Sequence, residues 1–247
     1  MPNLFDKFTD KRGLFIFNGE SSADFDLVVS EVPTFEKAGR KSSAFDIPGR
    51  NGSILYQQNA WNDVTRQYKV WAAVDDATCL PDKVNAFTAW LNSVTGYQRL
   101  EDSFEPETFR LAYYNGGTNV SSSLMQYGEA TISFTCRPER FYKTGEQVED
   151  LVNGTPIYNN TRFEAKPLIH LEGSGNITVS IGGKTIVANV ADYINIDCER
   201  MNAYRLPAEN KNDKITGTFP TIAPGVNTVG VTGTVTKATI VPRYFTI

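Results

Sequence analysis

Short runs rich in β-branched and aromatic residues, separated by Gly, Asn and Pro, recur through most of the sequence and constrain its fold more than any other feature. The clearest runs are 14–17, 25–29, 65–74, 130–136, 176–181 and 237–240. In the fourth run, Ile132, Phe134 and Cys136 alternate with Thr and Ser, which is the period of a strand that buries one face. This run then meets Pro138, which cannot donate a hydrogen bond to a strand ladder. The chain is therefore predicted to be mainly β.

One segment, LPDKVNAFTAWLNSVTG, has a helical period instead. Its apolar stripe consists of Leu80, Val84, Phe87, Trp90, Leu91 and Val94. Pro81 suits a first helical turn, Asp82 complements the helix dipole there, and Gly96 is a suitable stop. The segment predicts a single α-helix.

The length of 247 residues predicts two ordinary domains, each with its own core. The segment 141–167 is polar, rich in turn residues and contains two prolines, so we interpret it as a linker that becomes a long connection into a second domain. Beyond it, two β runs are joined by Gly182-Gly183, a hairpin signal, and further short runs follow without a helical period. We predict an N-terminal domain over 1–138 and a C-terminal β-sandwich over 139–247.

The composition excludes several classes of protein. A net charge of −4 and a pI near 5.2 argue against broad adhesion to nucleic acid or to an anionic membrane. The N-terminus lacks the apolar core of a secretory signal peptide, and no segment reaches the ~18 apolar residues of a membrane span. Cys79, Cys136 and Cys198 are odd in number and widely spaced, which disfavours a disulfide framework and indicates synthesis in a reducing cytoplasm.

The sequence contains little that points to catalysis. The one histidine, His170, has apolar neighbours in PLIHLEG, which predicts a packed or hydrogen-bonded strand residue rather than a base. The His and Cys residues lack the close pairs of a zinc site, and Gly173-Ser174-Gly175 is interpreted as a tight turn rather than a phosphate loop. We predict no catalytic residue, no cofactor and no metal.

Two alternatives to a purely structural protein stay open at this point. A glycosidase would need a carboxylate pair, and the pairs to inspect are Asp24 with Asp26, or Glu101 with Asp102, Glu105 and Glu107. A carbohydrate-binding β-sandwich would need an aromatic platform, for which Trp61, Trp71, Tyr113 and Tyr114 are the candidates. Acidic clusters are more often solvated loops, and aromatics in a β-rich chain mostly pack cores and subunit contacts.

A set of segments, taken in their order along the chain, resembles a known protein family. FNGESSADFDLVV, FDIPGRNGSILY, a helix ending in AWL, the pair Tyr127-Gly128 and ISFTCRPERFY follow one another in the first half. In the second half come NITVSIGGKTI, YINIDCERMNAYR, GTFPTIAPGVNTVGVTG and ATIVPRYFTI. In this order the sequence resembles the distal tail protein (Dit) family of long-tailed bacteriophages over nearly its whole length.

The resemblance implies a mainly β fold with two domains, a β-sandwich-like ring domain with one α-helix and a galectin-like β-sandwich. It implies a non-enzymatic virion protein of the tail tip, made in the host bacterial cytoplasm, that forms a hexameric hub ring through which DNA passes. The implied partners are the major tail tube protein, a tail-associated lysin or tail fibre protein, and a receptor-binding or baseplate protein. Neither a membrane nor a specific nucleic-acid sequence is an expected partner.

The stretch FDIPGRNGSILY is the candidate interface. Pro48 fixes its own φ, Gly49 and Gly52 allow conformations closed to other residues, and Asn51-Gly52 favours a tight turn into a strand over 53–56. We hypothesise that Pro48 to Gly52, with Arg50 donating to a carboxylate or to backbone carbonyls, forms a contact inside the N-terminal domain or between ring neighbours. The alternative is an ordinary turn with a solvated arginine.

Overall fold

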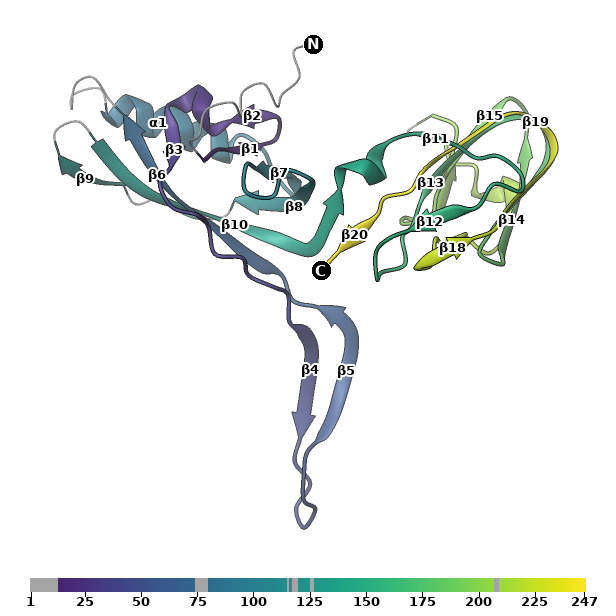
Figure 1. The fold of residues 1–247 in the computed structure, drawn as a ribbon, viewed down its shortest axis with the longest axis horizontal. Coiled ribbons are helices and arrows are strands. Elements are labelled where there is room, and N and C mark those ends of the chain that lie inside the picture. Colours follow the sequence, from purple (N-terminus) through teal and green to yellow (C-terminus); the bar gives the residue numbers. More distant parts are fainter. Residues whose placement is uncertain (1–12, 74–79, 115, 117–119, 125–126, 207–208) are drawn as a thin grey trace. The chain divides into compact units, whose positions relative to one another are not determined.

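The computed structural model describes residues 13–73, 80–114, 116, 120–124, 127–206 and 209–247 (Figure 1). The chain divides into two compact units, residues 1–140 with 247, and residues 141–246. The described residues are mainly strand, with one α-helix in the first unit, so the predicted fold class is confirmed. No helix in these residues is long and apolar enough to cross a membrane.

The first unit is built on one sheet. Its strands are β1 (Phe15–Phe17), β2 (Glu20–Ser21), β3 (Leu27–Val29), β6 (Val64–Ala73), β7 (Gln98–Asp102), β8 (Thr108–Tyr114), β9 (Val120–Leu124) and β10 (Tyr127–Tyr142). Their order is β2-β1-β7-β8-β10-β6-β3, with β9 paired to β10. The two long strands β10 and β6 are antiparallel from Tyr127 opposite Ala73 to Cys136 opposite Val64.

Helix α1 (Leu80–Asn92) supplies part of the core of this unit, as its periodicity predicted. Phe87, Trp90 and Leu91 are buried, and the Trp90 ring stacks on Phe25 at 4.5 Å and on Phe15 at 5.7 Å between ring centroids. The predicted strand over 25–29 is wrong at its beginning, because Ser22–Phe25 forms a 3-10 helix with a capping box.

Strand β10 continues beyond the proline that it was expected to meet. It includes Pro138 and runs to Tyr142. Its pairing with β6 stops at Cys136, so the missing N–H of Pro138 removes no hydrogen bond between these two strands. The last residues of β10 belong to the second unit, where Tyr142 N–H donates to Tyr244 O at 2.9 Å.

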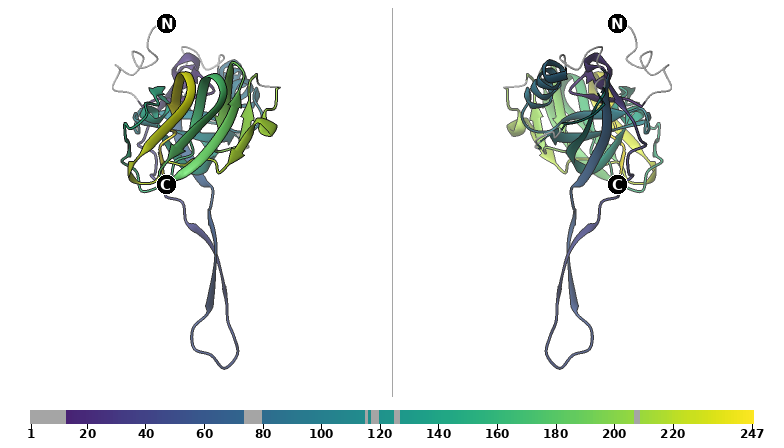
Figure 2. Two further views of the ribbon diagram at one scale, coloured as in Figure 1. Left: turned by 90° about the vertical axis from the view of Figure 1, so that its right-hand side faces the viewer. Right: turned by 90° about the vertical axis from the view of Figure 1, so that its left-hand side faces the viewer.

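The first unit also carries a two-stranded ribbon, which we call the arm: β4 (Arg40–Phe45), β5 (Ile54–Trp61) and the loop 46–53 between them. Both strands of the arm pair only with each other among the described elements. Figures 1 and 2 show the arm leaving the sheet at the beginning of β6 and projecting away from it.

The second unit is a β structure with its own core. Its elements are the 3-10 helices η4 (Lys143–Glu146) and η5 (Asn212–Lys214) and the strands β11 (Glu149–Asp150), β12 (Ile157–Asn159), β13 (Leu168–Ile181), β14 (Lys184–Val190), β15 (Tyr193–Asp197), β16 (Asn202–Tyr204), β17 (Ile215–Gly217), β18 (Gly225–Asn227), β19 (Val229–Val241) and β20 (Phe245–Thr246). The main sheet has the order β11-β19-β13-β14-β17, with β15 paired to β13 and β16 paired to β15. A second ribbon, β12–β18, contributes Ile157 to the same core.

Two expectations for this half are corrected and one is confirmed. Residues 141–167 are not a linker, because Leu151, Ile157 and Ala165 are buried in the second core. Gly173-Ser174-Gly175 lies within β13 rather than in a turn, at register shifts in its pairing with β19. The Gly182-Gly183 hairpin forms as predicted, with Ile181 opposite Lys184.

Candidate subunit interface

The arm places an apolar stripe on one face of its ribbon. Phe45 lies opposite Ile54, and Ser43 lies opposite Tyr56, so these pairs share a face. Phe45 is 58% exposed and Tyr56 is 60% exposed. On the other face Leu55 lies opposite Ala44 and is also exposed. An apolar surface on an unsupported ribbon is typical of a contact with another protein.

All five residues of the predicted interface lie in the loop at the tip of the arm. Arg50 N–H donates to Ile47 O at 3.1 Å, which closes a turn over Pro48-Gly49. Gly49 and Gly52 have φ of +82° and +84°, as their conformational role required. The Asn51-Gly52 pair does not form a two-residue hairpin turn, because β5 begins only at Ile54 and the loop spans 46–53.

The side chains of the tip include one that closes the loop and one that is exposed. Ser53 Oγ donates to Asp46 Oδ1 at 2.7 Å, and this bond ties the two ends of the loop together. Arg50 is exposed and makes no side-chain ion pair within the described part of the chain. The tip therefore presents a guanidinium at the end of the arm.

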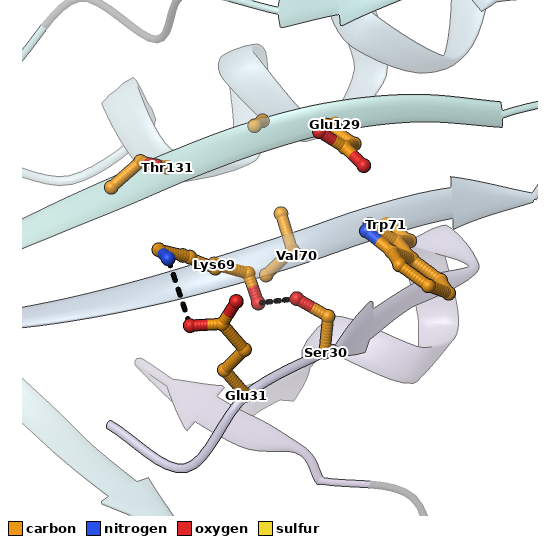
Figure 3. A pocket seen from close by; sticks show the side chains of 8 residues that line it. Ser30, Glu31, Lys69, Val70, Trp71, Glu129 and Thr131 are labelled. Atoms are coloured by element: carbon orange, nitrogen blue, oxygen red, sulfur yellow. Dashed lines mark hydrogen bonds and ion pairs between the residues drawn. The ribbon is translucent and has the colours of Figure 1, made fainter. Parts of the chain in front are cut away.

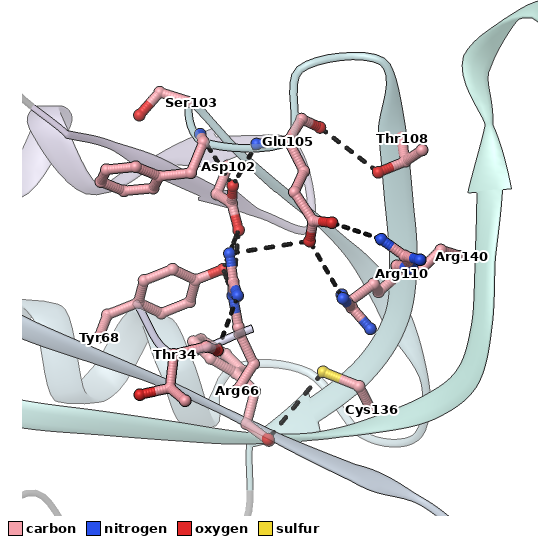
Figure 4. A network of polar contacts seen from close by, with 12 residues as sticks. Thr34, Arg66, Tyr68, Asp102, Ser103, Glu105, Thr108, Arg110, Cys136 and Arg140 are labelled. Atoms are coloured by element: carbon pink, nitrogen blue, oxygen red, sulfur yellow. Dashed lines mark hydrogen bonds and ion pairs between the residues drawn. The ribbon is translucent and has the colours of Figure 1, made fainter. Parts of the chain in front are cut away.

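The root of the arm is clamped by Arg66, shown in Figure 4. Its guanidinium lies on β6, just after the arm, and Nη1 donates to Thr34 O, just before the arm, at 3.0 Å. The ring of Phe35 lies 5.1 Å from the guanidinium carbon. Asn62 N–H also donates to Gly39 O at 2.9 Å. The two chain segments that enter and leave the arm are thus held together.

The Arg66 side chain is only 1% exposed and is paired on the opposite side of the clamp with Asp102 of β7. Asp102 Oδ2 accepts from Arg66 Nη2 at 2.7 Å and from the Tyr68 hydroxyl at 2.7 Å. Burial opposes the charge on Arg66, but Tyr68 and Asp102 outweigh it and raise the pKa of the guanidinium. Burial, followed by the charge of Asp102, raises the pKa of Tyr68 well above its ordinary value. The arm is anchored to the sheet by a buried charge pair with satisfied hydrogen bonds.

A second carboxylate extends this network (Figure 4). Glu105 accepts from Arg110 Nη2 at 3.0 Å and from Arg140 Nη1 at 2.6 Å. Burial alone would raise the pKa of Glu105, but the hydrogen bonds and charges of these two arginines lower it. Burial and the charge of Arg140 lower the pKa of Lys37, which lies on the segment that leads into the arm.

Except for Glu107, which is exposed, the carboxylates considered above as a catalytic pair have structural contacts. Asp102 and Glu105 are occupied by arginines, and Glu101 is bonded to Arg99. Asp24 caps the 3-10 helix after β2, and Asp26 is paired with Lys83. Sequence reasoning missed Arg66, although Arg66, Tyr68 and Val70 alternate on the buried face of β6, which was the signal for it.

A depression of about 400 Å³ lies on the outer face of β6 and β10 (Figure 3). Trp71 lies at one end of it, directly across the strand pair from Glu129. Lys69 Nζ is paired with Glu31 at 2.8 Å, and Ser30 Oγ donates to Lys69 O at 3.1 Å. The depression thus combines a half-exposed indole, 49% exposed, with an excess of carboxylate.

The four candidates for an aromatic platform have separate surroundings. Trp61 lies at the root of the arm beneath Arg40, and Tyr113 packs edge-on against Tyr97. Tyr114 packs on Phe134 in the core. Trp71 lies at the depression of Figure 3, on the outer face of the sheet.

In the second unit His170 lies on β13, as predicted. Its Nδ1 is 2.8 Å from Asn195 Oδ1, and its Nε2 is 3.1 Å from Glu172 Oε1. The Tyr193 ring is 5.7 Å from the imidazole, between centroids, and the Arg205 guanidinium carbon is 5.1 Å from the Tyr193 ring. These side chains form a hydrogen-bonded cluster of the kind expected for a strand histidine.

The cysteines that the structure describes are packing residues. Cys136 and Cys198 are buried and free, and burial raises their thiol pKa values to about 11 and about 12. Cys79 lies outside the described residues. Within the described ranges no cluster of His, Cys, Asp and Glu could hold a metal ion.

Comparison with known proteins gives a match in structure only. No protein-family profile and no curated protein sequence matches the chain. The chain is similar to the Dit protein of phage SPP1, described as a paradigm of the hub adsorption apparatus in phages that infect Gram-positive bacteria, with a TM-score of 0.77 and 15% identity over 95% of this chain and 99% of that one.

Chains of the phage p2 baseplate in its activated conformation match less closely. The structure with Sr gives a TM-score of 0.52 and 11% identity, covering 93% of this chain and 96% of that one. The structure with Ca gives 0.51 and 11%, covering 94% and 97%. The protein described here therefore has the fold of the Dit hub proteins of phage tails.

Proposed function

We propose that this chain is the subunit of a hexameric hub ring at the distal end of a long phage tail. The observation that carries the proposal is the shared fold over nearly the whole length of both this chain and the SPP1 hub protein. The first unit forms the ring, and the second unit serves as the attachment domain. The protein is made in the host cytoplasm and becomes part of the virion.

The arm supports assembly between copies. Its apolar stripe is exposed in the single chain, and a two-stranded ribbon is marginally stable by itself. A head-to-tail contact closes into a ring when the rotation between subunits is right, and such a contact needs two different patches on each subunit. The arm, with Pro48 to Gly52 at its tip, is one of the two patches.

The charge of the chain supports a conduit for DNA. A net charge of −4 disfavours phosphate binding, and a channel that DNA crosses during ejection should not retain it. The proposed partners are the major tail tube protein on one side and, on the other, a tail-associated lysin or tail fibre protein and a receptor-binding or baseplate protein. The role is structural, since Asp102 and Glu105, the carboxylates at the centre of the buried network, are held by arginines.

The first test is the mass of the purified full chain by light scattering on a sizing column, with negative-stain images of the peak. A mass of six subunits or a multiple of six, with an open ring in the images, is the expected result. If the chain stays monomeric across concentrations, the experiment is repeated with the tail tube protein as a template. A monomer in both conditions contradicts the proposal.

A second candidate function, saccharide binding by the second unit, is favoured by the cluster around His170. Its imidazole, amide and carboxylate groups lie beside the Tyr193 ring, a combination that can bind sugar hydroxyls and stack on a pyranose. Titration of the full chain with lactose, measured by calorimetry against a His170→Ala control, tests this candidate. If the titration releases no binding heat at millimolar lactose, the second unit does not bind galactosides at that concentration and this candidate is rejected.

A further inference from the structure

The depression of Figure 3 has a chemistry that suits a guanidinium. Trp71 exposes half of its indole, and the exposed Glu129 lies directly across from it without a partner in the described part of the chain. An arginine stacked on an indole face can donate to a neighbouring carboxylate at the same time, because its planar fork serves both contacts. Glu31 is already paired with Lys69, so Glu129 is the free acceptor.

The arm carries the complementary charge. Residues 40–61 contain Arg40, Lys41 and Arg50 against a single acid, Asp46, which gives them a formal charge of +2. Since the whole chain carries −4, the rest of it carries −6. Of these three cations, Arg50 lies at the tip, where it is exposed and has no ion pair among the described residues.

Arg50 cannot reach the depression of its own chain. The arm leaves the sheet at the beginning of β6, next to Val64, and projects away from it (Figure 1). Trp71 lies seven residues further along β6, a distance of about 23 Å at about 3.3 Å per residue. An Arg50 side chain that fills the depression would therefore come from a second copy.

We propose that Arg50 at the arm tip of one subunit docks in the Trp71–Glu129 depression of the next subunit. The inference rests on the proposed ring and names the second of its two patches. The arm is the donor, the depression is the acceptor, and each subunit supplies one of each, as a head-to-tail interface requires. The electrostatic pair selects the partner and the register of the contact.

The test is a charge swap in the full chain. Light scattering at a series of protein concentrations measures the concentration for half-assembly. Arg50→Glu and Glu129→Arg each place like charges in contact, and we expect each to raise the concentration for half-assembly by about tenfold or more. The double variant, Arg50→Glu with Glu129→Arg, restores the pair and returns assembly to within about threefold of the wild type. Arg162→Glu, a charge reversal on the exposed surface of the second unit, is the matched control and leaves assembly unchanged.

Cysteine cross-linking separates failure of this inference from failure of the proposed function. Arg50→Cys with Glu129→Cys gives oxidant-dependent covalent ladders, and neither single variant does. A wild-type ring without swap rescue and without ladders overturns the Arg50 contact alone and leaves the depression to another tail protein or to solvent. A wild type that stays monomeric both alone and with the tail tube protein, with no ladder from the double cysteine variant, overturns both. Circular dichroism of every variant is the check that each is folded.

Discussion

Two hairpins of this chain, the arm and β13–β14, are both joined by connections that contain glycine, but their apolar side chains differ in burial. Both are antiparallel strand pairs whose connection contains glycines at positive φ. In β13, Ile177, Val179 and Ile181 are fully buried, whereas Ile54 and Tyr56 of the arm are exposed. The two hairpins thus share a type of connection, but burial of the apolar face of each depends on what the rest of the chain, or another chain, places against it.

The largest expected effect on stability comes from removing Arg66, which joins the arm to the sheet through Asp102. Arg66→Ala leaves Asp102 buried without its cation, and we expect the free energy of unfolding to fall by about 3–5 kcal/mol. Urea unfolding followed by near-UV circular dichroism measures it. Arg50→Ala, at the exposed end of the same arm, is the control and changes stability by less than about 0.5 kcal/mol. A loss below about 1 kcal/mol for Arg66→Ala would contradict the clamp.

The next largest effect is expected when the same substitution is made in each of the two hairpins. Ile177→Ala removes a fully buried side chain from the second core and should cost about 2–5 kcal/mol in the unfolding of that unit. Ile54→Ala removes the same atoms from an exposed position in the arm and should change the stability of the single chain by less than about 0.5 kcal/mol, while it weakens assembly. Equal losses in unfolding for both variants would mean that the arm is packed in the single chain.

Acid should weaken each unit through a carboxylate that is paired with arginine. The pKa of Glu105 is held below its ordinary 4.5, so the folded state binds fewer protons than the unfolded state near that pH. Its stabilisation is present above about pH 4.5 and is lost as pH falls through the lower folded pKa. In Glu105→Gln the acid-dependent part of this loss should disappear, as measured by thermal unfolding between pH 3 and 6.

Asp197 of the second unit gives the matched case. Burial opposes its charge, but hydrogen bonds from Arg243 and from the backbone lower its pKa below 3.8. In Asp197→Asn only the unfolding of the second unit should lose acid dependence. If both variants altered the same transition, the two units would not unfold separately.

The smallest effect is expected at the turn glycines. Gly183 has φ of +85° and Gly52 has φ of +84°, so alanine is disfavoured by about 1 kcal/mol at either position. Gly183→Ala should lower the stability of the second unit by this amount, since its hairpin is part of the core. Gly52→Ala should leave global unfolding unchanged, because the tip is outside any core. Calorimetry of both variants measures the difference.

Local pattern determined much of this protein. Alternation in 130–136 and the helical stripe of 80–94 correctly predicted a strand and a helix, since each depends on residues close in sequence. Gly49 and Gly52 were expected to adopt conformations closed to other residues because glycine has no Cβ, and both have positive φ.

Only the tertiary structure decided the rest. Arg66 binds Asp102, 36 positions away, and no local period shows which carboxylate meets which arginine. Residues 141–167 look polar, yet a few apolar side chains in them complete a core whose other members lie far along the chain. Sequence periodicity shows which face of a strand is apolar. Long-range packing decides whether that face is covered, which is why the apolar face of the arm is exposed and that of β13 is buried.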